Sequence, residues 1–146
     1  MKKNKKVKHE KITPHRDKAD VIFSLYVRLF HADSNGYCTC ITCGKKLLWK
    51  GFGQLHAGHY IGRMHINTRY DERNVFPQCM SCNMFHEGER GAYTLFLIDK
   101  FGQGIIEELV LKGNEVVAWK WFDYKEVADM YKEKFNYLCQ EREING

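Results

Sequence analysis

The spacing of apolar residues predicts a helix near the start of the chain. From residue 19 to residue 32, apolar side chains recur every three or four positions, and the turn-forming residues 33–36 follow them. The members of one apolar face are Ile22, Tyr26, Leu29 and Phe30. Helical spacing returns at 92–101, at 105–111, and in a last helix that a predicted capping box of Asp123 and Glu126 begins.

The middle of the chain has the pattern of short strands. The segments 47–49 and 55–61 are short, apolar and separated by glycines, which predicts a small hairpin. The polar segment 62–74 is predicted to be a loop, and residues 79–85 are predicted to open a helix. The sequence therefore predicts an α+β fold with terminal helices around a small β hairpin.

Composition bounds the size of the unit and places its charge at one end. A chain of 146 residues with 44% hydrophobic residues is enough for one core. Residues 1–18 hold seven lysines and Arg16 against Glu10 and Asp17, a net charge of +6, so the rest of the chain sums to −1. We therefore predict a basic, flexible arm at 1–18 and a single domain at 19–146, the arm being either a solvated tail or a nonspecific phosphate-binding segment.

The apolar runs of the chain are short. The stretch Val21 to Phe23 is far from the length needed to span a bilayer, and the amino terminus carries no apolar stretch of signal-peptide length. We expect an intracellular, cytoplasmic protein with no membrane partner. In a reducing compartment its six cysteines favour metal binding over disulfide bonds.

Four cysteines form two C-x-x-C pairs, Cys40 with Cys43 and Cys79 with Cys82. Four thiolates suit a tetrahedral zinc ion and leave no open coordination position, so the predicted zinc is structural. The long spacer between the pairs must itself contain structure. Cys38 and Cys139 lie outside the pairs and are interpreted as ordinary thiols.

Between and after the cysteine pairs stand His59, Asn74 and Asn83, in that order. A histidine on a strand, an asparagine in a loop and a polar metal ligand at the start of a helix resemble the HNH, or His-Me finger, nucleases. The resemblance implies a ββα-metal core and metal-dependent hydrolysis of phosphodiester bonds in DNA.

That resemblance also implies roles for single residues. His59 matches the general base, since a neutral imidazole with an ordinary pKa of about 6.5 accepts a proton at physiological pH. Asn74 matches the residue that ties the loop to the strand, and Asn83 matches a ligand of a catalytic divalent ion, Mg²⁺ or another. The chain departs from the family where Gly58 replaces the usual ligand before the base, so His56 is the expected substitute and His86 the reserve ligand.

Each of these residues also has an ordinary interpretation. Histidines such as His56, His65 and His86 are often hydrogen-bonded polar residues without a catalytic role. Arg63 is the preferred phosphate contact among the loop arginines, although such arginines are commonly solvated or paired with acidic neighbours such as Asp71 and Glu72.

A wider set of motifs resembles the phage NinG (Rap) recombination proteins. The matching strings are Gly58–Ile61, Thr68–Asn74 and Gln78–Asn83, together with Ser24–Arg28, Asn35–Gly36 and Cys40–Gly44. The resemblance implies a phage or prophage nuclease in a bacterial host that cuts branched DNA, including Holliday junctions and displacement loops.

Two other functions remain open from the residues themselves. In one, the chain is a zinc-organised DNA-binding module without catalysis, and in the other it is a zinc-built protein-interaction module. A two-strand cut would be easiest for a homodimer. The apolar run Val116 to Phe122 is either a dimer surface or part of the core.

Overall fold

The computed structural model describes residues 9–51 and 55–144, so residues 1–8 of the predicted arm at 1–18 lie outside the described residues, whereas residues 12–18 of that arm form the start of the first helix. Its elements in chain order are α1 (Ile12–Phe30), β1 (Tyr37–Thr39), β2 (Lys46–Leu48), β3 (Leu55–His59), α2 (Ile66–Arg69), β4 (Val75–Cys79), the π-helix η1 (Ser81–Phe85), α3 (Arg90–Phe101), α4 (Ile105–Gly113) and α5 (Trp121–Glu141). The α+β class is confirmed, as five α-helices and two small two-stranded sheets in the described part of the chain.

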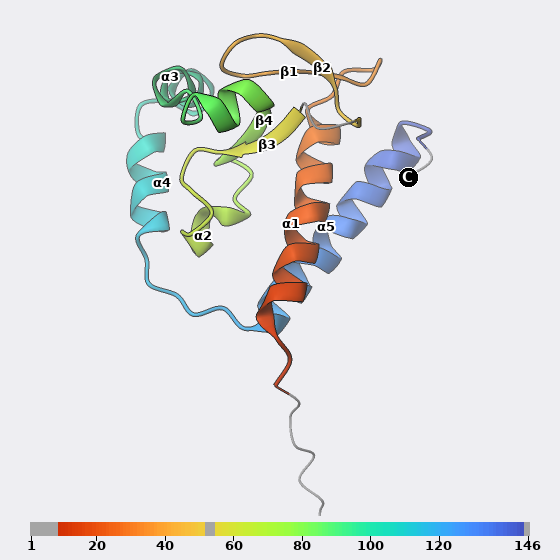
Figure 1. Ribbon diagram of the computed structural model, residues 1–146, viewed down its shortest axis with the longest axis vertical. Coiled ribbons are helices and arrows are strands. Elements are labelled where there is room, and N and C mark those ends of the chain that lie inside the picture. Colours follow the sequence, from red (N-terminus) through yellow and green to blue (C-terminus); the bar gives the residue numbers. More distant parts are fainter. Residues whose placement is uncertain (1–8, 52–54, 145–146) are drawn as a thin grey trace, which may run out of the picture.

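Helices α1 and α5 lie side by side and run in the same direction (Figure 1). At one end His15 packs against Trp121, and at the other Arg142 donates to the carbonyls of Phe30 and Ala32. The residues of α1 that are fully buried are Ala19, Phe23, Tyr26, Val27 and Leu29. Burial begins only at Ala19, which explains why the apolar pattern missed the first seven helical residues of α1.

The predicted pairing of the two central segments is wrong. Strand β2 pairs antiparallel with β1, and β3 pairs antiparallel with β4, from Leu55 opposite Cys79 to His59 opposite Val75. The first cysteine pair itself forms the turn of the β1–β2 hairpin, because the Cys40 N–H donates to the Lys45 carbonyl at 2.8 Å. The sequence of Thr39–Gly44, with its closely spaced cysteines and Gly44, predicts such a tight turn, and only the pairing of the strands that it joins was not predicted.

Strand β4 was not predicted. All five of its residues are buried, so its sequence Val-Phe-Pro-Gln-Cys shows no alternation of apolar and polar positions. After β4 the predicted helix is present only as the five-residue π-helix η1. The predicted loop likewise contains the single helical turn α2.

The carboxyl-terminal half closes the fold around two clusters of apolar side chains. Helices α3 and α4 pack against Tyr60, Ile61 and Phe76, while α5 packs on α1. The last helix begins at Trp121, three residues before the start that the predicted capping box implies, and the Asp123 carboxylate accepts the Lys120 N–H at 2.7 Å. Asp123 is therefore the third helical residue and not the residue before the helix.

The segment before α5 is only partly packed. Val116 is fully exposed, whereas Trp119 stacks on Tyr70 with ring centroids 5.9 Å apart. None of residues 116–122 is fully buried, so of the two alternatives for this run, core does not hold for Val116. Among the described residues, no helix is long and apolar enough to cross a membrane.

Candidate functional site

The two cysteine pairs come together in space. The sulfur atoms of Cys40, Cys43, Cys79 and Cys82 all lie within 4.8 Å of one another, and the Cys43 and Cys79 sulfurs are 3.7 Å apart. Four thiolates at about 2.3 Å from one zinc ion, in a tetrahedron, would lie about 3.8 Å from each other. The cluster therefore fits a metal ion such as zinc, as the sequence predicted.

The two remaining cysteines take no part in this cluster. Cys38 is buried and its thiol donates to the Arg28 carbonyl at 2.9 Å, while Cys139 is buried in the core between α1 and α5. His86 lies just beyond η1 and lines the depression beside Cys43, Cys79 and Cys82. It does not line the cavity that holds His59, because η1 ends before completing the expected helical turn.

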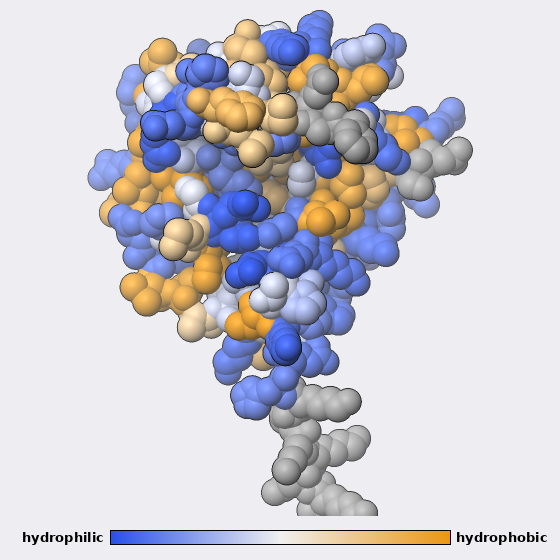
Figure 2. All heavy atoms as spheres, viewed as in Figure 1, coloured by the Kyte–Doolittle hydropathy of each residue, from blue (hydrophilic) through white to orange (hydrophobic). Residues whose placement is uncertain are grey.

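A cavity of about 700 Å³ lies between η1, β3 and α1. The molecule is hollowed on this face, with hydrophobic side chains over η1 at the rim (Figure 2). Four residues singled out in the sequence line this cavity: His56, His59, Arg63 and Asn83. Asn74 does not line it and lies fully buried behind the loop.

His59 is held by a backbone carbonyl. Its Nε2 lies 2.8 Å from the Arg69 carbonyl oxygen, which can only accept, so Nε2 carries the proton and Nδ1 holds the lone pair. Within residues 9–51 and 55–144 no hydrogen-bond partner of Nδ1 is found. Burial and the nearby Arg63 and Arg69 charges together lower the pKa of His59 to about 4, against the opposing effect of the hydrogen bond to the Arg69 carbonyl. The imidazole is therefore neutral at pH 7 and able to accept a proton at Nδ1.

The carbonyl that holds His59 is itself held from α1. The Arg69 guanidinium makes a two-pronged ion pair with Asp20, at 2.9 Å from Nε to Oδ1, and it also donates to the Arg63 carbonyl at 2.6 Å. The Tyr70 hydroxyl donates to the same Asp20 carboxylate at 2.7 Å. Asp20 thus connects α1 to the loop that orients His59.

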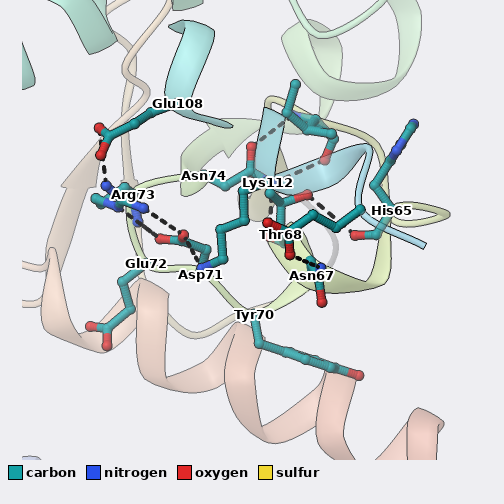
Figure 3. Close-up of polar contacts among 12 residues, drawn as sticks. His65, Asn67, Thr68, Tyr70, Asp71, Glu72, Arg73, Asn74, Glu108 and Lys112 are labelled. Atoms are coloured by element: carbon teal, nitrogen blue, oxygen red, sulfur yellow. Dashed lines mark hydrogen bonds and ion pairs between the residues drawn. The ribbon is translucent and has the colours of Figure 1, made fainter. Parts of the chain in front are cut away.

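Asn74 closes the loop between β3 and β4. Its side-chain amide donates to the carbonyls of Ile61 and Thr68 at 3.0 and 2.9 Å, and its oxygen accepts the Ile61 N–H at 2.7 Å. Beside it, the loop residue Asp71 accepts hydrogen bonds from Arg73 of the same loop and from Lys112 of α4, which binds the loop to that helix (Figure 3). These contacts hold the loop, and with it the Arg69 carbonyl, in one conformation.

His56 and Asn83 lie side by side in the cavity. The Asn83 amide nitrogen is 2.9 Å from His56 Nδ1. One imidazole nitrogen and one amide oxygen would leave most positions of a divalent ion open to water and phosphate. Among the described residues, however, the four cysteines are the only group of three or more histidine, cysteine or acidic side chains placed to hold a metal.

Gly58, where the HNH pattern expects a ligand, has no room for a side chain. A Cβ atom added there would lie 2.0 Å from Oε1 of Gln78, whose side chain is completely buried. Gln78 donates to the Gly88 carbonyl at 2.9 Å and to the Thr42 hydroxyl at 3.2 Å, which hold its amide over Gly58. Close packing therefore explains the departure from the pattern.

Comparison with known proteins places the chain. The family described as Bacteriophage Lambda NinG protein matches residues 1–141. The chain belongs to the NinG family. It is 30% identical over 104 residues to "Protein ninG" of Escherichia phage 933W and of Escherichia phage lambda, and 29% identical to that of Salmonella phage P22. Each match covers 70% of this chain, which spans about half the length of these curated relatives (48% to 49%). No solved structure matches.

In this NinG-family chain the loop arginines differ in their pairing. Arg69 pairs with Asp20, and Arg73 pairs with Asp71 at 3.1 Å, as the ordinary interpretation expects. Arg63 is exposed at the edge of the cavity, and no acidic side chain of the described residues pairs with it. Of the three, Arg63 alone is available to an anion in the cavity.

Sequence reasoning missed the contribution of α1 to the cavity. Asp20, Ser24 and Arg28 line it from one face of this helix, four residues apart. That spacing is a signal in principle, because residues at i, i+4 and i+8 share a helix face. The apolar face of the same helix gives the stronger pattern, and it alone predicted the helix.

Proposed function

We propose that this NinG-family chain is a metal-dependent DNA endonuclease of the HNH type. The observation that carries the proposal is the tautomer of His59, whose Nε2 is bound to the Arg69 carbonyl. The opposite nitrogen is then a neutral base in a cavity that also holds His56, Asn83 and an unpaired arginine. These are the parts that hydrolysis of a phosphodiester requires.

In the proposed reaction, water attacks the phosphorus atom while its proton passes to Nδ1 of His59, and the bond from phosphorus to the leaving oxygen breaks. Arg63 binds a phosphate oxygen. A divalent ion held by His56 and Asn83 would stabilise the charge that develops on the phosphate and on the leaving oxygen. Because an imidazole nitrogen suits nickel whereas an amide oxygen suits magnesium or manganese, the test includes all three ions.

We assign the four-cysteine cluster to a structural zinc ion. The coordination shell would be complete with four sulfurs, so this ion would hold the β1–β2 turn against the end of β4 and η1. The expected result is one zinc per chain by mass spectrometry under native conditions, lost in Cys43→Ser and kept in Cys139→Ser. Equal zinc content in both variants would contradict the assignment.

The substrate is proposed from the family resemblance. Branched DNA such as Holliday junctions is the proposed target, and a homodimer is the proposed form for cutting two strands. Both belong to the proposal for the whole protein, since the chain spans about half the length of its relatives.

The test is cleavage of matched linear and four-way-junction DNA with magnesium, manganese or nickel. Loss of the general base should lower the rate about 100- to 10,000-fold in His59→Ala. The matched control is His86→Ala, whose exposed side chain lies outside the cavity and should leave the rate unchanged. Wild-type chain that binds DNA but cuts neither substrate with any of the three ions would replace the enzyme with a zinc-organised DNA-binding module.

A further inference from the structure

Helix α1 brings a second arginine to the cavity, beside the residues of the proposed nuclease site. Arg28 lines the cavity together with His56, His59 and Asn83, and its side chain is partly buried. Two of its donors are used by the protein: Nε donates to the Ser24 carbonyl at 3.2 Å and Nη1 to the Trp49 carbonyl at 3.0 Å. These bonds hold the plane of the guanidinium, and Nη2 has no partner among the described residues.

Arg28 has no acidic counterpart. All 18 aspartate and glutamate residues of the chain lie within the described residues, and none is within ion-pair distance of Arg28. Asp20 also lines the cavity, but its carboxylate is committed to Arg69 and Tyr70. A partly buried guanidinium without a carboxylate loses water contacts, and the two backbone carbonyls replace them only in part. Because burial disfavours the charged form, it lowers the pKa of Arg28.

We propose that Arg28 binds a DNA phosphate adjacent to the one that is cut, so that the substrate strand is held between α1 and the Arg63 side of the cavity. This inference rests on the proposed nuclease function and adds a second phosphate subsite to it. An oxyanion beside Nη2 would supply the missing counter-charge, and the bonds to Ser24 and Trp49 orient the guanidinium for it in advance. The cavity of about 700 Å³ has room for a nucleotide-sized group.

The chain provides a matched control in Arg142. This arginine also donates to two backbone carbonyls, those of Phe30 and Ala32, and also has no carboxylate partner among residues 9–51 and 55–144. It lines a different depression, at the end of α5. Arg28 and Arg142 therefore each bind two backbone carbonyls. Of the two, only Arg28 lines the cavity that His59 lines.

The experiment measures binding of the zinc-loaded full chain to four-way-junction DNA, without a catalytic divalent ion, as a function of salt concentration. In Arg28→Gln, affinity should fall at least about 5-fold, and the slope of log affinity against log salt should decrease by about 0.9, the value for one phosphate contact. Arg142→Gln should keep the wild-type slope. Circular dichroism and zinc content establish that the variants are folded.

The outcomes separate this inference from the nuclease. If Arg28→Gln keeps the wild-type slope or changes only as Arg142→Gln does, the subsite is overturned even where the wild type cuts DNA. If the slope decreases as expected but the wild type cuts nothing, Arg28 remains a contact to a DNA phosphate and the nuclease function fails. Wild type that does not bind DNA overturns both. Where Arg28→Gln does not fold, Arg28→Lys replaces it; lysine keeps the charge but has no guanidinium for Ser24 and Trp49 to orient, so unchanged affinity in that variant overturns the oriented Nη2 contact.

Discussion

At the scale of single residues, the site depends on which nitrogen of His59 carries the proton. The Arg69 carbonyl accepts from Nε2, and Arg69 in turn is held by Asp20 of α1. A free imidazole samples both tautomers, so this contact chooses the one that leaves Nδ1 as a base. The tautomer of His59 is therefore set by a backbone oxygen, and it depends on the loop conformation more than on the identity of a side chain.

Nitrogen NMR of the imidazole groups tests this arrangement directly. The His59 signals, identified by their loss in His59→Gln, should show the Nε2–H tautomer and should titrate near pH 4, because burial lowers the pKa of His59 to about 4. In Asp20→Ala, where Arg69 loses its ion pair, both tautomers should be populated. An Nδ1–H tautomer in the wild type would contradict the role of Nδ1 as the base, whereas a titration near the ordinary 6.5 would contradict the lowering of the His59 pKa by burial.

The site residues that the sequence alone predicted share one property: each was recognised by its spacing from other motif residues along the chain. The paired cysteines and the order of His59, Asn74 and Asn83 were visible because each lies near a motif. The contribution of Asp20 and Arg28 comes from how α1 packs across β3, a long-range contact that no local pattern contains.

At the scale of elements, the β3–β4 hairpin shows why the strand prediction failed. Alternation marks a strand with one solvated face, but β4 is buried on both faces and includes the buried Gln78. Its partner β3 carries Gly58 where the Gln78 amide crosses it. This hairpin, whose register places His59 opposite Val75 and Gly58 opposite Phe76, therefore needs a small residue at position 58, where the Gln78 side chain lies.

Replacing Gly58 tests this contact. Gly58→Ala should lower the free energy of unfolding by about 1–3 kcal/mol, because the added carbon would displace the completely buried Gln78 side chain. Gly62→Ala is the control, since a Cβ atom there meets nothing within 4 Å, and it should change stability by less than about 0.5 kcal/mol. Denaturant titration measures both, and equal effects would mean that the hairpin adapts to the larger side chain.

The loop before β4 is anchored to α4 through Asp71. The side chain of Asp71 is only 7% exposed and pairs with both Arg73 and Lys112, which hold its pKa down at about 2. Asp71→Asn should therefore cost about 1–3 kcal/mol of stability. Glu108, which pairs with Arg73 at 3.3 Å but is 65% exposed, provides the contrast: Glu108→Gln should cost about 0–1 kcal/mol. A larger loss of stability in Glu108→Gln than in Asp71→Asn would contradict the prediction that the buried Asp71 contributes more than the exposed Glu108.

At the scale of the whole molecule, two partly buried histidines connect stability to pH. Burial lowers the pKa of both His31 and His59 to about 4, and for His31 the charge of Lys100 contributes to that shift. In the unfolded chain both titrate near 6.5, so as the pH falls from 6.5 to 4 the unfolded state takes up protons that the folded state does not. Stability should therefore be constant above about pH 7 and should fall through this window.

The size of the loss can be assigned to single histidines. After allowance for partial solvent screening, each should contribute about 1–3 kcal/mol between pH 7 and pH 4. The Asp71 pKa of about 2 places its own effect below pH 3.8, outside this window.

Protonation of metal-binding thiolates also destabilises the fold in acid, but it acts equally in wild type and in His31→Gln. The difference in pH dependence between these two chains, measured by denaturant titration at pH 7 and pH 4.5, isolates His31. Parallel curves would mean that His31 takes up its proton in the folded state, in spite of its packing against Phe76.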